Sequence, residues 1–218
     1  MIISHKHKFI FIHIPKCAGS TICYSLINNL YPKNSPDKGS FNQLDPSIAE
    51  VFKVAVNQGN SHELNQHGTL KDIKIYLSKK NLNINDYFKF SFMRNPWERR
   101  VSQYFYAKRM AKKDFEWAKR ISALSFYEFI TKRNPDSQLN WVSDKKDNIA
   151  VDFLGSGRSL QEDFNTICDQ IGITKQELPH KNATKHKHYT EYYNDETRSI
   201  VASNCSKDIE YFNYKFGE

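Results

Sequence analysis

A lysine, a glycine and two hydroxyl side chains lie close together after the first long apolar run of the sequence. Lys16 precedes Gly19, and Ser20 and Thr21 follow that glycine at once. A loop that leaves a strand and enters a helix presents backbone N–H groups and the positive end of the helix dipole, so it can bind phosphate. In such a loop Gly19 permits close approach of the backbone and Lys16 supplies positive charge. The segment from His13 to Thr21 is therefore a candidate phosphate loop.

The order of these residues differs from the nucleotide-hydrolase pattern GxxxxGK[ST]. That pattern needs the lysine directly after its last glycine, followed by a hydroxyl residue that holds magnesium. Here Lys16 comes before Gly19. The spacing argues against a kinase or an ATPase, and a nucleotide kinase is kept as the alternative enzyme class. Taken alone, the loop could also be an ordinary surface turn with an exposed lysine.

A second candidate phosphate site lies in the segment FSFMRNPWERRVSQYFY. Arg94 directly follows a predicted strand, and Ser102 lies two turns into the helix that we expect to start at Pro96. Ligands of parallel sheets bind at the carboxyl ends of the strands. A guanidinium offers two parallel hydrogen bonds to a phosphate, and the Ser102 hydroxyl can add another. The alternative interpretation of Arg94 is an ion pair at a helix end.

Apolar periodicity predicts the elements that position these two segments. Strands are predicted at 8–14, 88–93 and 149–154. Helices are predicted at 20–31, 70–80, 96–113 and 160–171, in two pieces within 115–133, and in one or two pieces within 190–212. Because strands alternate with helices, the sequence predicts one α/β domain over residues 1–218, a three-layer sandwich with a mainly parallel central sheet. The polar segments 32–46 and 134–148 are predicted as loops, and the first could be a lid that contacts substrate.

Composition limits the class of protein. The chain has 218 residues, of which 39% are hydrophobic, enough for one substantial core. Its net charge of +8 favours anionic partners such as nucleotides, acidic glycans, nucleic acid or anionic lipid surfaces. The apolar run 9–14 is too short for a signal peptide or a membrane span, so we expect a cytoplasmic protein. Reduced thiols, without disulfide or metal spacing, are expected at Cys17, Cys23, Cys168 and Cys205.

Taken together, FIHIPKCAGST and FMRNPWERRVSQYFY resemble the 5'-phosphosulfate loop and the 3'-phosphate segment of the sulfotransferases. The likeness points to the group that contains bacterial enzymes and the Golgi carbohydrate sulfotransferases, including heparan sulfate 2-O-sulfotransferase. Further similarity extends it over most of the chain, in QHGTLKDIKIYL, VDFLGSGRSLQEDFNTICDQIGI, LPHKNAT and KDIEYFNYKFG. The resemblance implies a fold like that of the P-loop nucleotide hydrolases. It also implies transfer of a sulfuryl group from 3'-phosphoadenosine 5'-phosphosulfate (PAPS) to a hydroxyl, with no metal.

The resemblance also assigns donor contacts residue by residue. The 3'-phosphate contacts fall on Arg94 and Ser102. Lys185, in the basic stretch 180–188, is a further candidate for the donor's phosphates, and a solvated loop is the alternative there. Lys16 is expected to neutralise the leaving 5'-phosphate oxygen. The 5'-phosphosulfate contacts fall on Lys16, Cys17, Ala18, Gly19, Ser20 and Thr21.

Sulfuryl transfer needs a base for the proton of the acceptor hydroxyl, and histidine titrates in the useful pH range. His67 aligns with the position at which similar sulfotransferases place a histidine base, between the two donor segments and just before a predicted helix. His62 is the alternative base. A capping or surface role is the structural alternative for His67. His13 is expected to be a packed histidine or a wall of the donor site.

The acceptor is the least specified part of the prediction. The resemblance favours a carbohydrate, while glycolipids, lipid-linked sugars and small hydroxylated metabolites stay open because acceptor pockets are built from variable loops. A basic nucleic-acid-binding or glycan-binding protein is the non-enzymatic alternative. Nucleic acid is not expected as a partner, since the aromatic residues have core-like spacing. Peripheral membrane contact is compatible with the positive charge, and the oligomeric state stays open.

Overall fold

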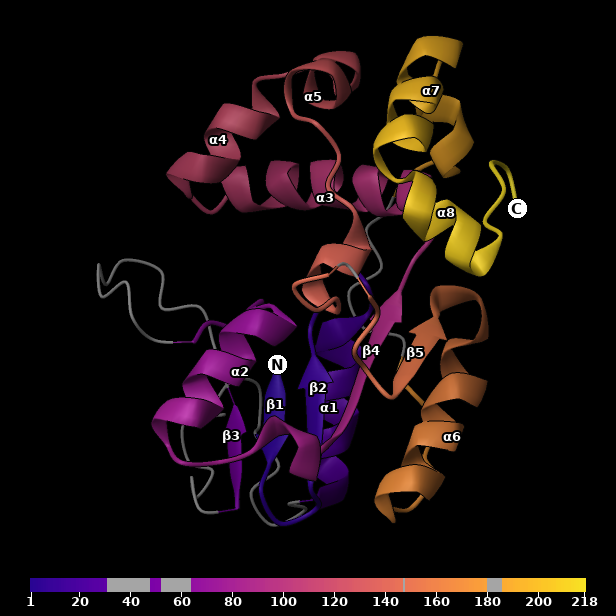
Figure 1. Cartoon of the computed structure of the whole chain (residues 1–218). Helices are drawn as coiled ribbons and strands as arrows, with labels where there is room; N and C mark the ends of the chain where they lie inside the picture. The colour runs from indigo at the N-terminus through magenta and orange to yellow at the C-terminus, as the bar shows by residue number, and fades with distance from the viewer. Residues whose placement is uncertain (31–47, 52–63, 147, 180–185) are drawn as a thin grey trace. The chain divides into compact units, whose positions relative to one another are not determined.

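The computed structural model describes residues 1–30, 48–51, 64–146, 148–179 and 186–218 (Figure 1). The predicted loop 32–46, His62 and Lys185 lie outside these residues. The chain divides into two compact units, and the prediction of a single domain stays a prediction. The sheet unit comprises residues 1–93 and 140–181, and the helical unit comprises residues 94–139 and 182–218.

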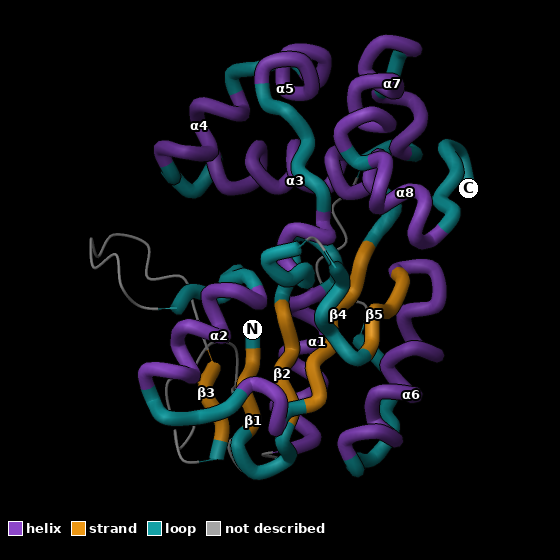
Figure 2. Tube along the Cα trace, viewed as in Figure 1, coloured by secondary structure: helices purple, strands orange, loops and turns teal. Residues whose placement is uncertain are grey.

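Within the described residues, the sheet unit contains a five-stranded sheet of order β3-β1-β2-β4-β5 (Figure 2). The strands β2 and β4 pair in parallel, as do β4 and β5, whereas β1 pairs antiparallel with both β2 and β3. The strand β3 therefore runs in the direction of β2, and only β1 opposes the others. This confirms the mainly parallel sheet. The strands are β1 (Ile2–Ser4), β2 (Phe9–Ile12), β3 (Ala49–Val51), β4 (Phe88–Met93) and β5 (Phe153–Ser156).

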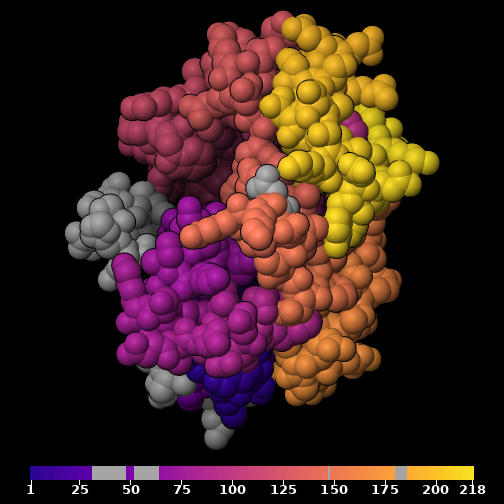
Figure 3. Space-filling view, viewed as in Figure 1, coloured from indigo at the N-terminus to yellow at the C-terminus, as the bar shows by residue number. Residues whose placement is uncertain are grey.

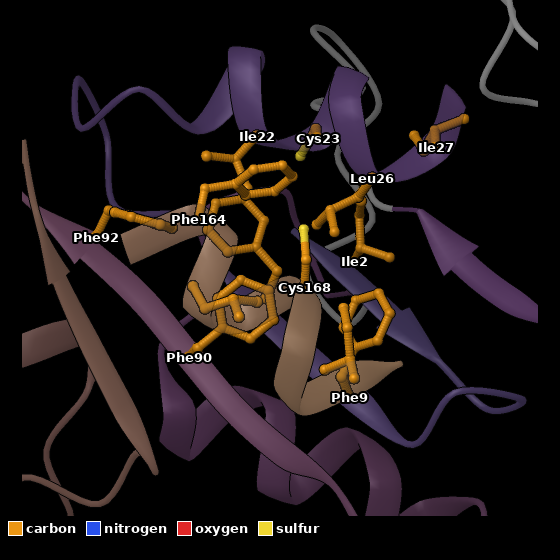
Figure 4. Close-up of a cluster of buried hydrophobic side chains, with 13 residues drawn as sticks. Ile2, Phe9, Ile22, Cys23, Leu26, Ile27, Phe90, Phe92, Phe164 and Cys168 are labelled. Carbon is orange, nitrogen blue, oxygen red and sulfur yellow. The ribbon is translucent and has the colours of Figure 1, made fainter. Parts of the chain in front are cut away.

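Helices cover both faces of this sheet, which confirms the three-layer arrangement. One face packs against α1 (Gly19–Leu30) and α6 (Leu160–Ile171). Side chains alternate between the faces of a strand, so every second residue of β2 and β4 enters this core. Fully burying a large apolar side chain contributes about 1.5–3 kcal/mol, so the cluster is a major source of stability. Its aromatic members are Phe11 and the four that Figure 4 labels, Phe9, Phe90, Phe92 and Phe164.

The helix α2 (Leu70–Lys79) lies on the opposite face (Figure 1). In the space-filling view, magenta atoms of α2 and its neighbouring segments, together with orange atoms from later in the chain, leave little of β1 and β2 visible from that side (Figure 3). Thr69 begins the helix with a capping box, in which its hydroxyl accepts the Asp72 N–H and the Asp72 carboxylate accepts the Thr69 N–H. The predicted inward residues, Leu70, Ile73 and Leu77, are all buried.

The helical unit is built around the long helix α3 (Pro96–Ala111). The short helices α4 (Glu116–Ser122) and α5 (Phe126–Lys132) follow it, and Ser125 starts the second with a capping box. This confirms the two predicted pieces. The carboxyl-terminal part forms α7 (Asp195–Asn204) and α8 (Ser206–Phe212). Their shared core includes Trp97, Val101, Tyr104, Phe129, Ile130, Tyr189, Val201 and Tyr214.

The third predicted strand is displaced. It was expected at 149–154, but β5 begins at Phe153. Upstream of it, Ile149 forms an isolated antiparallel bridge with Ser143, and the Ala150 N–H donates to the Val142 carbonyl. The first part of the apolar run is thus paired locally and is not available to the sheet. The predicted loop 134–148 also contains a short 3-10 helix, Gln138–Trp141.

Candidate functional site

The candidate phosphate loop joins β2 to α1 and has an unusual backbone. Lys16 and Ala18 have positive φ angles of 69° and 58°, whereas Cys17 between them is outside that region. The left-handed conformation costs roughly 1–2 kcal/mol for a residue with a side chain. Backbone that alternates in this way directs successive N–H groups toward one concavity, which suits an anion. The N–H groups of Gly19 and Ser20, at the start of α1, can add to it, whereas those of Thr21 and Ile22 donate to the Ala18 carbonyl.

Gly19 is required at this position by a histidine. A Cβ atom on Gly19 would lie 1.9 Å from Cδ2 of His13, so no side chain fits unless the ring moves. The His13 side chain is buried, as expected for a packed histidine. Its ring also packs edge-on against His67, with 4.5 Å between the ring centroids. The sequence interpretation ascribed Gly19 to phosphate approach, and the structure adds this packing requirement.

His13 is held in its neutral form. Burial lowers its pKa well below the ordinary value of 6.5, and the positive charges of the Met1 amino group, of His67 when it is protonated, and of Lys16 lower it further. A neutral His13 adds no positive charge to the loop.

His67 lies directly beside the loop with both ring nitrogens engaged. Its Nδ1 is 2.9 Å from the backbone oxygen of His13, and its Nε2 is 2.9 Å from Nε2 of Gln66. A carbonyl oxygen only accepts, so Nδ1 carries the proton and Nε2 of neutral His67 accepts from the Gln66 amide. Nε2 is therefore the nitrogen that can take up a proton.

The backbone of His67 is also tied down. Its N–H donates to Oδ1 of Asn65 at 2.8 Å, and its carbonyl accepts from the Trp141 indole at 3.0 Å. His67 thus stands two residues before the cap of α2 without capping that helix. The sequence interpretation missed Gln66 and Trp141 as partners of His67. Only the presence of an apolar Trp141 in a polar segment gave a signal for the second.

The second candidate segment begins the helical unit. Arg94 follows β4, Asn95 caps α3 by accepting the N–H groups of Trp97 and Glu98, and Pro96 occupies the first turn as predicted. Ser102 is buried in the second turn of the same helix. The Arg94 guanidinium forms an ion pair with Glu98, four residues later. The alternative interpretation of Arg94, a helix-end ion pair, therefore describes its side chain correctly, and an incoming phosphate would share or displace Glu98.

Membrane-spanning helices and metal-binding clusters are both absent from the described residues. Within the described parts of the chain, no helix is long and apolar enough to cross a membrane. In the same residues, no group of three or more His, Cys, Asp or Glu side chains is arranged to hold a metal ion.

Comparison with known proteins identifies the class. The model of the sulfotransferase family matches residues 1–215. An uncharacterized protein of Archaeoglobus fulgidus is 32% identical over 101 residues, which cover 41% of this chain and 72% of that protein. No solved structure matches. The chain therefore belongs to the sulfotransferase family, whose members transfer sulfuryl groups to an acceptor.

Proposed function

We propose that this protein transfers the sulfuryl group of PAPS to a hydroxyl of an acceptor, with carbohydrate as the favoured class. One observation carries the proposal: a strained, N–H-rich loop at the start of α1 lies against a histidine whose Nε2 is oriented to accept a proton. Family membership supplies the reaction class.

The residues of the loop fit an anionic group of the donor. Cys17 is buried and its backbone N–H donates to the Ile14 carbonyl at 3.4 Å, so in this proposal it contributes by shaping the loop. Ser20 is exposed at the first turn of α1 and can offer its hydroxyl, and Thr21 follows it. Lys16 supplies the positive charge that a phosphosulfate requires. In this proposal Ala18 and Gly19 complete the cradle with backbone N–H groups.

Arg94 and Ser102 are proposed to bind the 3'-phosphate. An arginine can contact two oxygens of one phosphate at once. Because a 5'-monophosphate nucleotide lacks the 3'-phosphate, this contact would favour the bisphosphate. The partly exposed Arg94–Glu98 pair contributes little by itself, so the doubly charged phosphate can compete for the guanidinium. Lys185 is retained as a proposed donor contact.

In the proposed transfer, the acceptor oxygen forms a bond to sulfur as the bond from sulfur to the 5'-phosphate oxygen breaks. The acceptor proton passes to Nε2 of His67, and adenosine 3',5'-bisphosphate leaves. Lys16 stabilises the charge that develops on the leaving oxygen. By analogy with phosphoryl transfer, positioning and charge stabilisation supply most of the acceleration.

The hydrogen bond from His67 to His13 supports the role of the base. When Nε2 gains the proton, the positive ring still donates from Nδ1 to the His13 carbonyl, and a charged donor strengthens that bond. The hydrogen bond from Gln66 to Nε2 of His67 must break before the acceptor hydroxyl can donate to that nitrogen.

Calorimetric titration tests the donor. Adenosine 3',5'-bisphosphate is expected to bind in the presence of EDTA, and ATP with magnesium is expected to bind more weakly. The opposite order would support the nucleotide kinase instead. Binding of acidic glycan or nucleic acid without any bisphosphate binding would support the non-enzymatic alternative. A screen of carbohydrates, glycolipids and small hydroxylated metabolites with labelled PAPS then identifies the acceptor.

A further inference from the structure

Arg94 lies between two regular elements, and a distant glutamine holds its backbone. β4 ends at Met93, and Asn95 is the cap of α3. The Arg94 N–H donates to Oε1 of Gln138 at 2.9 Å, and Nε2 of Gln138 donates to the Arg94 carbonyl at 2.8 Å. One side chain thus binds both backbone groups of the arginine.

A buried carboxylate determines which way the glutamine points. Asp208 accepts from the backbone N–H of Gln138 at 2.7 Å and from its Nε2 at 3.2 Å. The same carboxylate accepts from the Ser137 hydroxyl at 2.6 Å and from the Leu139 N–H at 3.2 Å. Because a carboxylate only accepts, the Gln138 amide must turn its NH₂ toward Asp208, which leaves Oε1 for the Arg94 N–H.

Both members of this clamp, Gln138 and Asp208, are fully buried. A buried carboxylate without donors is costly, so four donors converging on Asp208 make this arrangement specific. The clamp touches the backbone of Arg94 and leaves its guanidinium for other partners. The clamp therefore fixes the position of the Arg94 backbone, from which the side chain extends.

We infer that Gln138, oriented by Asp208, is a positioning residue for the contact of Arg94 with the donor's 3'-phosphate. The inference rests on the proposed function. Two simultaneous hydrogen bonds from a guanidinium to a phosphate require a precise origin and direction of the side chain. With the clamp, the backbone of Arg94 is ordered before the ligand arrives, so binding does not have to order it.

The test compares two nucleotides that differ only in the 3'-phosphate. Calorimetry gives the ratio of the dissociation constant of AMP to that of adenosine 3',5'-bisphosphate for the wild type and for Gln138→Met, which keeps a similar shape without the amide. We expect Gln138→Met to lower this ratio about tenfold, the factor that accompanies loss of a typical hydrogen bond, with AMP affinity unchanged. A residue that only supports the fold would weaken both nucleotides and leave the ratio constant.

A matched control and a milder variant complete the design. Tyr104→Phe removes a different, partly buried hydrogen bond of α3, the one to the Leu124 carbonyl, and is expected to keep the wild-type ratio. Ser137→Ala removes one donor from Asp208 and is expected to lower the ratio about threefold. If Gln138→Met does not fold, the Ser137→Ala ratio decides.

The outcomes separate the two proposals. A wild type that binds AMP as tightly as the bisphosphate would overturn the proposed donor site, and with it the role of the clamp. A wild type that prefers the bisphosphate, with the same preference in folded Gln138→Met, would overturn the positioning role and leave the donor site in place. An unchanged ratio in Ser137→Ala would do the same if it is the deciding variant.

Discussion

The two candidate anion-binding segments keep their key residues in place by different means. From Lys16 to Ala18, the backbone conformation of consecutive residues shapes the loop, and the ring of nearby His13 packs against Gly19. At Arg94, the backbone is held by Gln138, 44 positions away, which is oriented by Asp208, a further 70 positions along. The first segment depends on local strain and close packing, and the second on hydrogen bonds between distant residues. A substitution in the first segment should therefore weaken ligand binding by distorting the loop. A substitution among the partners of Arg94 should weaken it because the arginine is no longer oriented.

The largest effect is expected for His67, which packs beside the first segment and is the proposed base. His67→Ala should reduce turnover by about 10²- to 10⁴-fold, the usual contribution of a general base. Bisphosphate affinity should stay near the wild-type value, because the proposed donor contacts lie elsewhere. Steady-state transfer assays and calorimetry measure the two quantities. The exposed His188 provides the control in His188→Ala, and near-normal turnover of His67→Ala would exclude His67 as the base.

Gly19→Ala tests whether the loop depends on close packing. The added Cβ meets the buried His13 ring, so we expect a loss of about 1–3 kcal/mol in the free energy of unfolding, together with weaker bisphosphate binding. Denaturant unfolding and calorimetry measure these changes. In the same unit, Gly172→Ala is the control, since its Cβ meets nothing within 4 Å and only its positive φ is unfavourable. Gly172→Ala should lose stability without losing affinity. A Gly19→Ala protein with wild-type affinity would contradict the packing argument.

The pH dependence of stability tests whether His13, which packs against Gly19, is buried in its neutral form. Its folded pKa is lower than its unfolded value, so the unfolded chain binds the proton more readily. Stability should therefore be fully present above pH 6.5 and decrease as the pH falls from there toward the folded pKa, by at most about 1.4 kcal/mol per pH unit. Denaturant unfolding between pH 7 and pH 5 measures the slope. His13→Gln should flatten it, and an equal slope in that variant would assign the effect to other groups.

The smallest expected effect concerns the competition at Arg94. Glu98→Gln removes the negative partner of the guanidinium and should tighten bisphosphate binding, by no more than about fivefold, because partly exposed ion pairs contribute about 0.2–1 kcal/mol. AMP binding should not change. Glu116→Gln removes one of the two carboxylate partners of the exposed Lys119 and serves as the control. Weaker bisphosphate binding in Glu98→Gln would mean that Glu98 orients Arg94.

The features that the sequence predicted well have local causes. The helix α6 was predicted with its observed bounds, because its apolar spacing is visible in consecutive residues. The cap Asn95 and Pro96 mark the start of α3 in the same way. The strands β1 and β3, of three residues each, were not predicted, because runs so short carry little periodicity and form only where a neighbouring strand supplies hydrogen bonds.

By itself, the sequence determined the family, the main elements of the sheet and the two segments that are proposed to bind the donor, because each is encoded in a continuous stretch of residues. Only the tertiary structure decided that Nδ1 of His67 carries the proton, that Gly19 must leave room for His13, and that Gln138 and Asp208 hold Arg94. The physical reason is that a hydrogen bond or a packing contact depends on atoms within a few ångströms. Partners separated by 44, 54 or 70 positions come within that distance only when the chain is folded.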